Sequence, residues 1–211
     1  MSERGKSIYL EGIGGAGKST QIKFLLEYMS SLGQETILTR EPGGNPAAEK
    51  IRGLIFKLKG EGVINADHQM ALFFAARYLW VTEVVKPNLD KGIHVISDRS
   101  YFSTVAYQGY AEGGDLDTIL KIADVVMEGC KPDAVILLDI SPEEAAMRRS
   151  KRSESDPFDS EGFSYVTRLI NGYRDMAQNN LGNVPWTVIN GEQSVEKVSD
   201  EIKAVLSSTL C

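Results

Sequence analysis

The sequence predicts a three-layer α/β fold, in which helices flank both faces of a five-stranded parallel sheet. Five short runs rich in β-branched residues alternate with segments whose apolar residues recur at helical spacing. Turn-forming residues follow each run, so we expect helical crossovers between strands that lie parallel. No internal repeat or flexible linker divides the 211 residues, which predicts a single domain over residues 1–211.

The expected strands are, in chain order, 7–10, 35–39, 94–97, 134–139 and 186–189. The longest helical pattern covers 67–85, and Pro87 stands just beyond its expected end. After the fourth strand, Ser141, Pro142 and Glu144 predict an N-cap, a first-turn proline and a capping-box glutamate. The stretch 153–162 has no apolar periodicity and predicts a mobile loop.

Composition excludes several classes of protein. A formal net charge of −6 argues against a general nucleic-acid or anionic-membrane binder, which needs a basic surface. The apolar runs are far shorter than the roughly 20 residues of a membrane helix. Two cysteines make no disulfide framework, and the N-terminus has no signal-peptide pattern. We therefore expect a cytoplasmic protein with no nucleic-acid or membrane partner.

The stretch LEGIGGAGKST, residues 10–20, fits two nucleotide-binding signatures. Its glycines match the dinucleotide pattern GxGxxG, and it also matches the phosphate-loop pattern GxxxxGK[ST]. Only the phosphate loop uses a lysine and a hydroxyl after the last glycine: Lys18 neutralises the β- and γ-phosphates, and Ser19 holds magnesium. A glycine-rich turn without a ligand is the alternative interpretation.

A strand precedes this loop and a helix follows it, as the phosphate loop (P-loop) requires. The fold class is therefore a P-loop NTPase fold. The residues expected to bind the phosphates of a nucleotide are Gly12, Gly14, Gly15, Ala16, Gly17, Lys18, Ser19 and Thr20. A P-loop alone suits a GTPase switch, an ATPase or a kinase.

Three further motifs narrow the choice. TREPGG (39–44) and SDRSYFSTVAYQG (97–109) follow the second and third strands, and LFFAARY (72–78) lies on the long helix. In open α/β sheets, ligands bind at the carboxyl ends of the strands. With these motifs in this order, the chain resembles the thymidylate kinase family from Tyr9 to about Ala177. The resemblance implies transfer of a phosphoryl group from ATP to dTMP with Mg²⁺, in a homodimer, giving dTDP and ADP.

The resemblance also implies a dTMP site. Phe73 would stack on thymine, Arg77 would bind its exocyclic oxygen, and Arg99 and Arg40 would lie at the acceptor phosphate. The remaining residues of this site would be Thr104, Tyr107 and Gln108, with Tyr107 crowding a ribose 2′-hydroxyl. From the residues alone, Phe73 also suits a core position, the two arginines also suit ordinary ion pairs, and Gln108 also suits a helix surface.

On the donor side, the resemblance puts Asp98 near magnesium with Ser19. Members of the family carry an arginine for the transferred phosphoryl group either inside the P-loop or in a mobile lid. This P-loop has no arginine between its glycines, so the resemblance implies that the lid supplies it. Arg148 and Arg152 end the helix that enters a lid at about 149–162, and Arg152 best matches the arginine that reaches the transferred phosphoryl group. Together with Lys18 and Arg99 it would form the catalytic set. Solvated charges at a helix end are the alternative.

The chain departs from the family pattern at four places. Gly14 replaces the usual acidic residue of the loop, Asn45 replaces a threonine, and Pro157 replaces a lid arginine. The stretch YAEGG (110–114) lacks a usual basic residue. Two alternative functions follow from these departures: a kinase for another acceptor such as dUMP, or a nucleotide-binding regulatory module with little turnover.

Overall fold

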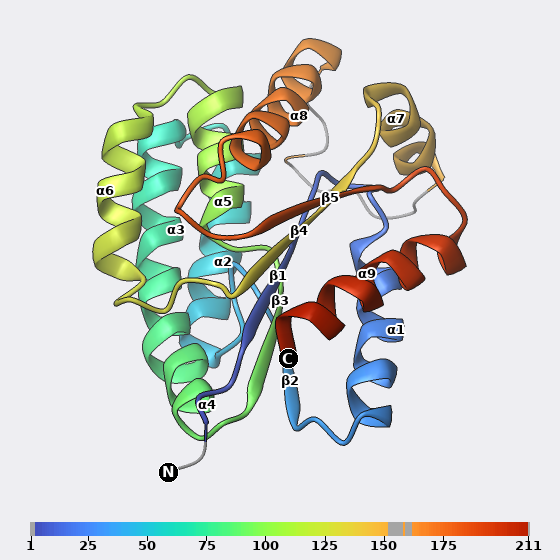
Figure 1. The fold of residues 1–211 in the computed structure, drawn as a ribbon. Helices are drawn as coiled ribbons and strands as arrows, with labels where there is room; N and C mark the ends of the chain where they lie inside the picture. Colours follow the sequence, from blue (N-terminus) through green and yellow to red (C-terminus); the bar gives the residue numbers. More distant parts are fainter. Residues whose placement is uncertain (1–2, 152–157, 159–161, 211) are drawn as a thin grey trace.

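The computed structural model describes residues 3–151, 158 and 162–210, and there it has one five-stranded parallel sheet of order β2-β3-β1-β4-β5 (Figure 1). The strands are β1 (Ser7–Glu11), β2 (Thr36–Arg40), β3 (His94–Asp98), β4 (Ala134–Asp139) and β5 (Trp186–Asn190). The predicted α/β fold class, with a five-stranded parallel sheet flanked by helices, is confirmed.

Four strands run one residue further than predicted, because pairing with a neighbour keeps a polar residue extended. Arg40 on β2 pairs in register with Asp98 on β3, and Glu11 on β1 pairs with Leu137 on β4. At the end of β5, Asn190 pairs with Asp139 of β4. Polar residues of low strand propensity thus stand at the carboxyl ends of the strands.

Helices cover both faces of the sheet (Figure 1). On one face lie α1 (Lys18–Ser31) and α9 (Val195–Leu210), which pack on each other. The other face carries α3 (Ala66–Trp80), α5 (Tyr101–Thr104), α6 (Leu116–Val126) and α8 (Phe163–Gln178), and α2 (Pro46–Gly60) packs on α3. Beyond the carboxyl ends of the strands lies α7 (Pro142–Ser150), which contacts α8.

The long helical pattern continues past its expected end. After α3 the chain makes a π-helical segment, η1 (Val81–Val85), and then α4 (Lys86–Asp90). The prediction that Pro87 lies beyond this helix is wrong. Pro87 stands in the first turn of α4, where a missing backbone N–H is tolerated.

The predicted N-cap of α7 is present, but only half of the capping box forms. The Ser141 hydroxyl accepts a hydrogen bond from the Glu144 backbone N–H at 3.2 Å. The Ser141 backbone N–H donates to Glu192 at 2.7 Å, which takes the place expected for the Glu144 side chain. Glu144 instead pairs with Arg148, one turn along the helix.

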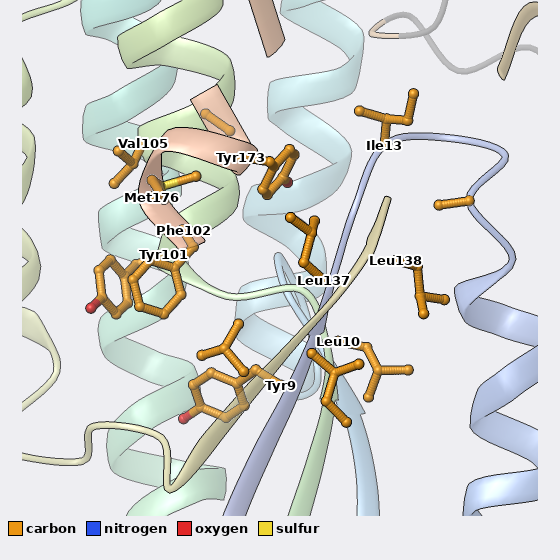
Figure 2. Packing of buried hydrophobic residues seen from close by; sticks show 14 of the residues in the cluster. Tyr9, Leu10, Ile13, Tyr101, Phe102, Val105, Leu137, Leu138, Tyr173 and Met176 are labelled. Atoms are coloured by element: carbon orange, nitrogen blue, oxygen red, sulfur yellow. The ribbon is translucent and has the colours of Figure 1, made fainter. Parts of the chain in front are cut away.

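The central strand β1 is buried along its whole length. Figure 2 shows Tyr9 and Leu10 on opposite faces of the sheet, with Leu10 on the side of α1. Tyr9 packs against Trp80 of α3, with 5.7 Å between ring centroids. Because both faces of β1 are packed, the loop that follows it leaves the sheet from a rigid base.

Candidate active site

The glycine loop leaves the centre of the sheet, because β1 lies between β3 and β4. Gly12, Gly15 and Gly17 have φ of 136°, 95° and 98°, values that side chains rarely tolerate. A Cβ on Gly12 would lie 2.6 Å from the Leu138 carbonyl oxygen. Helix α1 begins directly after the loop, at Lys18, so its first backbone N–H groups face the space above the sheet edge.

Lys18 folds back over this loop. Its Nζ donates to the carbonyl oxygens of Gly12 at 2.8 Å and Ile13 at 3.2 Å, and its side chain is buried. Ser19 and Thr20 are exposed in the first turn of α1. The lysine, the two hydroxyls and the N-terminus of α1 therefore lie together at the loop.

Arg148 reaches the loop from α7. Its guanidinium donates to the Gly15 carbonyl at 3.3 Å and to Glu144 at 2.5 Å. The structure therefore places this arginine against the P-loop. Arg152 and Pro157 lie outside the described residues.

A pocket opens beside the loop, between the carboxyl end of β3 and helices α2, α3 and α5. Six of the seven residues predicted for the dTMP site line it: Phe73, Arg77, Arg99, Thr104, Tyr107 and Gln108. The seventh, Arg40, lines a neighbouring pocket together with Ser19 and Asp98, and there it forms a bidentate ion pair with Glu49.

Arg99 stands where the pocket meets the P-loop. Its φ of 76° is unusual for a residue with a side chain and aims the guanidinium back across the edge of the sheet. The guanidinium donates to the Gly12 carbonyl at 3.0 Å, so Arg99 and Lys18 share one acceptor. It also donates to the Tyr107 hydroxyl at 3.3 Å.

Arg77 lies at the other end of the pocket, in an ion pair with Glu41 that is almost entirely buried. It also donates to the Thr104 hydroxyl at 2.9 Å. Burial raises the pKa of Glu41 to about 7, and the positive charge of Arg77 opposes this rise. The pair holds the arginine in one place, because either charge alone would be costly in the interior.

The aromatic wall of the pocket has members that sequence reasoning missed. Phe158 is buried, and its ring centroid lies 6.0 Å from those of Phe73 and Tyr107 and 5.6 Å from that of Phe56. Phe158 stands inside the polar stretch 153–162, where nothing local marks it as a pocket residue.

Tyr107 and Gln108 come from a π-helical segment, η2 (Val105–Ala111), which continues α5. Such wide turns are rare and occur often at functional sites. Gln108 is buried and donates to Gln69 of α3 at 3.1 Å, so its side chain is held at the pocket wall. The helix-surface interpretation of Gln108 is therefore wrong.

Sequence reasoning also missed the acidic residues behind the pocket. Glu11 is fully buried and accepts hydrogen bonds from Ser100, Ser103 and Tyr173. Burial raises its pKa, and the nearby positive charge of Arg99 acts in the opposite direction. The available signal was an acidic residue at the end of an otherwise apolar strand, directly before the loop.

Asp98 has the features of a cation ligand. Its Oδ1 atom is buried and accepts no hydrogen bond from the residues that the structure describes. Ser19 lines the same pocket, so a carboxylate and a hydroxyl face one space. These oxygen donors suit a hard cation such as Mg²⁺, which binds proteins through few side chains and keeps several waters. Among the described residues, no group of three or more His, Cys, Asp or Glu side chains has metal-site geometry.

The chain is similar along almost its whole length to known proteins. The family model described as thymidylate kinase matches residues 10–202. A thymidylate kinase of Francisella tularensis subsp. novicida (strain U112) is 35% identical over 201 residues, 95% of each chain. One from Hahella chejuensis (strain KCTC 2396) is 35% identical over 208 residues, 99% of each chain. Within the described residues, no helix is both long and apolar enough to cross a membrane.

Proposed function

The chain belongs to the thymidylate kinase family, and on that premise we propose which residues carry the transfer of a phosphoryl group from ATP to dTMP. The observation that carries this assignment is the pocket beside the P-loop: an aromatic side chain and one arginine lie at its far end, and a second arginine lies at the loop. A nucleoside monophosphate has the same polarity, with a base at one end and a phosphate at the other.

On the donor side, the backbone amides of residues 12–17 and the N-terminus of α1 hold the phosphates of ATP. Lys18 and Arg148 neutralise the phosphate oxygens, and the contact of Arg148 with the loop supports this role. Arg152 joins them at the transferred group. No side chain acts as a nucleophile, because the acceptor phosphate is already anionic near neutral pH.

Ser19 and Asp98 would hold Mg²⁺, which the buried Oδ1 atom of Asp98 supports. When bound, Mg²⁺ would neutralise the negative charge that develops on the phosphates during transfer. These two residues lie at the end of β3 and the start of α1, so the rigid sheet sets their separation.

On the acceptor side, Phe73 stacks on thymine and Arg77 binds an exocyclic oxygen of the base, while Thr104 and Gln108 complete the wall. Tyr107 leaves no room for a 2′-hydroxyl. Arg99 holds the acceptor phosphate in line with ATP. We assign Arg40 to the same phosphate, which it would reach after leaving Glu49.

We further propose that residues 1–211 act as one kinase domain with a lid at 149–162. The enzyme would work as a homodimer in the cytoplasm. The packing of the last helix, α9, on α1 supports a single domain. Leu54 on α2, Tyr78 on α3 and Val125 on α6 are exposed apolar side chains on neighbouring helices, and they support a dimer.

The test is ADP formation from ATP and Mg²⁺, with dTMP, dUMP, the ribonucleotide of thymine, CMP, AMP and GMP offered separately. We expect strong preference for dTMP. The variant Lys18→Ala should lose activity by about a hundredfold or more, because it removes the positive charge that stabilises the transferred phosphoryl group. Lys197→Ala, an exposed lysine on α9, should keep wild-type activity.

Each other outcome contradicts one part of the proposal. Preference for another monophosphate would mean that Gly14 has changed the sugar site. ATP binding without turnover of any acceptor would mean that the chain is a regulatory module. An active Lys18→Ala variant would remove the P-loop lysine from the mechanism.

A further inference from the structure

Glu11 collects hydrogen bonds from two elements that border the pocket. One carboxylate oxygen, Oε1, accepts from the Ser100 hydroxyl at 2.7 Å. The other, Oε2, accepts from the Ser103 hydroxyl at 2.8 Å and from the Tyr173 hydroxyl at 3.1 Å. Ser100 caps α5, Ser103 lies on α5, and Tyr173 lies on α8.

The same two hydroxyls contact Arg99. Its Nη1 lies 3.1 Å from the Ser103 hydroxyl oxygen and 3.3 Å from the Tyr173 hydroxyl oxygen. A hydroxyl has one hydrogen to donate and lone pairs to accept with. The two hydroxyl oxygens also lie 2.9 Å apart, where either can donate to the other. The ionised Glu11 carboxylate is the stronger acceptor, and when both hydroxyls donate to it, both turn lone pairs toward the guanidinium.

We propose that Glu11 is a positioning residue for the acceptor phosphate: by taking the hydroxyl hydrogens of Ser103 and Tyr173, it holds Arg99 at the P-loop end of the pocket. This inference rests on the proposed role of Arg99 as the arginine of the acceptor phosphate. Glu11 contacts no substrate in this arrangement and acts only through the two hydroxyls.

The direction of the network depends on charge. An ionised carboxylate only accepts hydrogen bonds, whereas an amide at the same place also donates. Arg99 and Lys18 favour the ionised form of Glu11 against the cost of burial. The buried pair of Glu41 and Arg77 also lies within reach of its charge. A buried anion that merely filled space would be replaced at little cost by an apolar side chain of similar size.

The network also ties the acceptor site to the donor site. Glu11 is bonded through the chain to Gly12, whose carbonyl oxygen accepts from both Lys18 and Arg99. Contact with the P-loop therefore helps to set the position of Arg99. An in-line transfer needs this relation, because the acceptor oxygen must be positioned relative to the γ-phosphate to within a fraction of an ångström.

The test compares binding of dTMP and thymidine to the Glu11→Gln variant by calorimetry without ATP. Thymidine lacks the phosphate, so it makes no direct contact with Arg99 in the proposed arrangement. An amide nitrogen at the Oε1 position would meet the Ser100 hydroxyl, one at the Oε2 position would meet those of Ser103 and Tyr173, and in either orientation the negative charge is lost. We expect the dTMP affinity to fall about tenfold and the thymidine affinity to stay within about twofold of wild type.

The matched control is Glu41→Gln, which changes the other buried glutamate of the pocket. Glu41 holds Arg77 at the base end, so we expect this variant to lose affinity for dTMP and thymidine by the same factor. If the ratio of dTMP to thymidine affinity falls in Glu11→Gln but not in Glu41→Gln, then Glu11 positions one arginine and does not merely stabilise the pocket as a whole.

Arg99→Ala distinguishes a failure of this inference from a failure of the proposed function. If Arg99→Ala leaves the ratio of dTMP to thymidine affinity unchanged, Arg99 does not bind the acceptor phosphate, and both the assignment and this inference are overturned. If Arg99→Ala lowers the ratio and Glu11→Gln does not, only the inference is overturned.

A second variant covers the case in which Glu11→Gln does not fold. Ser103→Ala combined with Tyr173→Phe removes both hydroxyls and leaves Glu11 and the tyrosine ring in place. We expect it to lower the ratio of dTMP to thymidine affinity by about fivefold or more. Equal losses for the two ligands in a folded variant would mean that the network only stabilises the fold.

Discussion

Phe73 and Phe74 are neighbours on α3, and both are buried, with 8% and 4% of their surface exposed. Only Phe73 lines the pocket, where it meets Phe158. The Phe74 ring instead lies under the Arg77 guanidinium, 4.6 Å from its centre. Two adjacent residues of one type therefore serve different purposes, which no local pattern distinguishes.

We predict that Phe73→Leu weakens dTMP binding about tenfold or more and leaves the KM for ATP nearly unchanged, because stacking of a base on an aromatic ring is worth about 1–3 kcal/mol. Leucine keeps most of the buried apolar volume. The measurement is the dissociation constant of dTMP beside the KM for ATP.

Phe102→Leu is the control, since it removes a buried ring that packs on Trp186 and does not line the pocket. It should lower the stability of the protein to urea without a selective loss of affinity for dTMP. Equal losses for dTMP and ATP in Phe73→Leu would assign Phe73 to the core alone.

At the scale of elements, the site depends on how helices begin. Asn45 caps α2, accepting hydrogen bonds from the backbone N–H groups of Ala47 at 3.0 Å and Ala48 at 2.9 Å. Helix α2 then carries Glu49, which holds Arg40, and Phe56 of the pocket wall. The substitution of asparagine for the usual threonine therefore keeps a capping function.

We predict that Asn45→Ala lowers the free energy of unfolding by about 1 kcal/mol, because two backbone N–H groups of α2 lose their acceptor. Urea denaturation measures this. Asn45→Thr restores an oxygen at the cap and should recover most of the loss. If alanine and threonine were equally destabilising, the amide would matter for a reason other than the cap.

At the scale of the whole molecule, three exposed apolar side chains lie on neighbouring helices. Leu54 on α2, Tyr78 on α3 and Val125 on α6 are 45%, 47% and 76% exposed, and the three helices pack side by side. An apolar surface of this kind on a small enzyme favours contact with a second copy of the chain.

We predict that Val125→Asp shifts the protein from dimer to monomer, because a charge buried in the interface would lack a partner. Val188→Asp is the matched control: Val188 is 51% exposed but lies on the edge strand β5, on a different part of the surface. Sedimentation velocity at several concentrations distinguishes the two variants. A monomeric wild type would contradict the proposed homodimer.

The sequence by itself determined the class of fold and the chemistry of the P-loop. Strand runs, helical spacing and the run from Gly12 to Ser19 are local signals, because backbone conformation and phosphate binding there depend on residues close together in the chain. The order of the motifs was enough to indicate the family. The extra residue at the end of four strands escaped prediction, because strand pairing keeps it extended.

Only the tertiary structure decided which side chains share the pocket and what holds them. Glu11 and Tyr173 are far apart in sequence and meet only because α8 packs over the end of β1. Glu41 with Arg77, and Phe158 with Phe73, are also pairs that only the packing of distant segments brings into contact. The physical reason is that a buried charge or ring is defined by its partners, and those partners are brought together by packing between elements rather than by spacing along the chain.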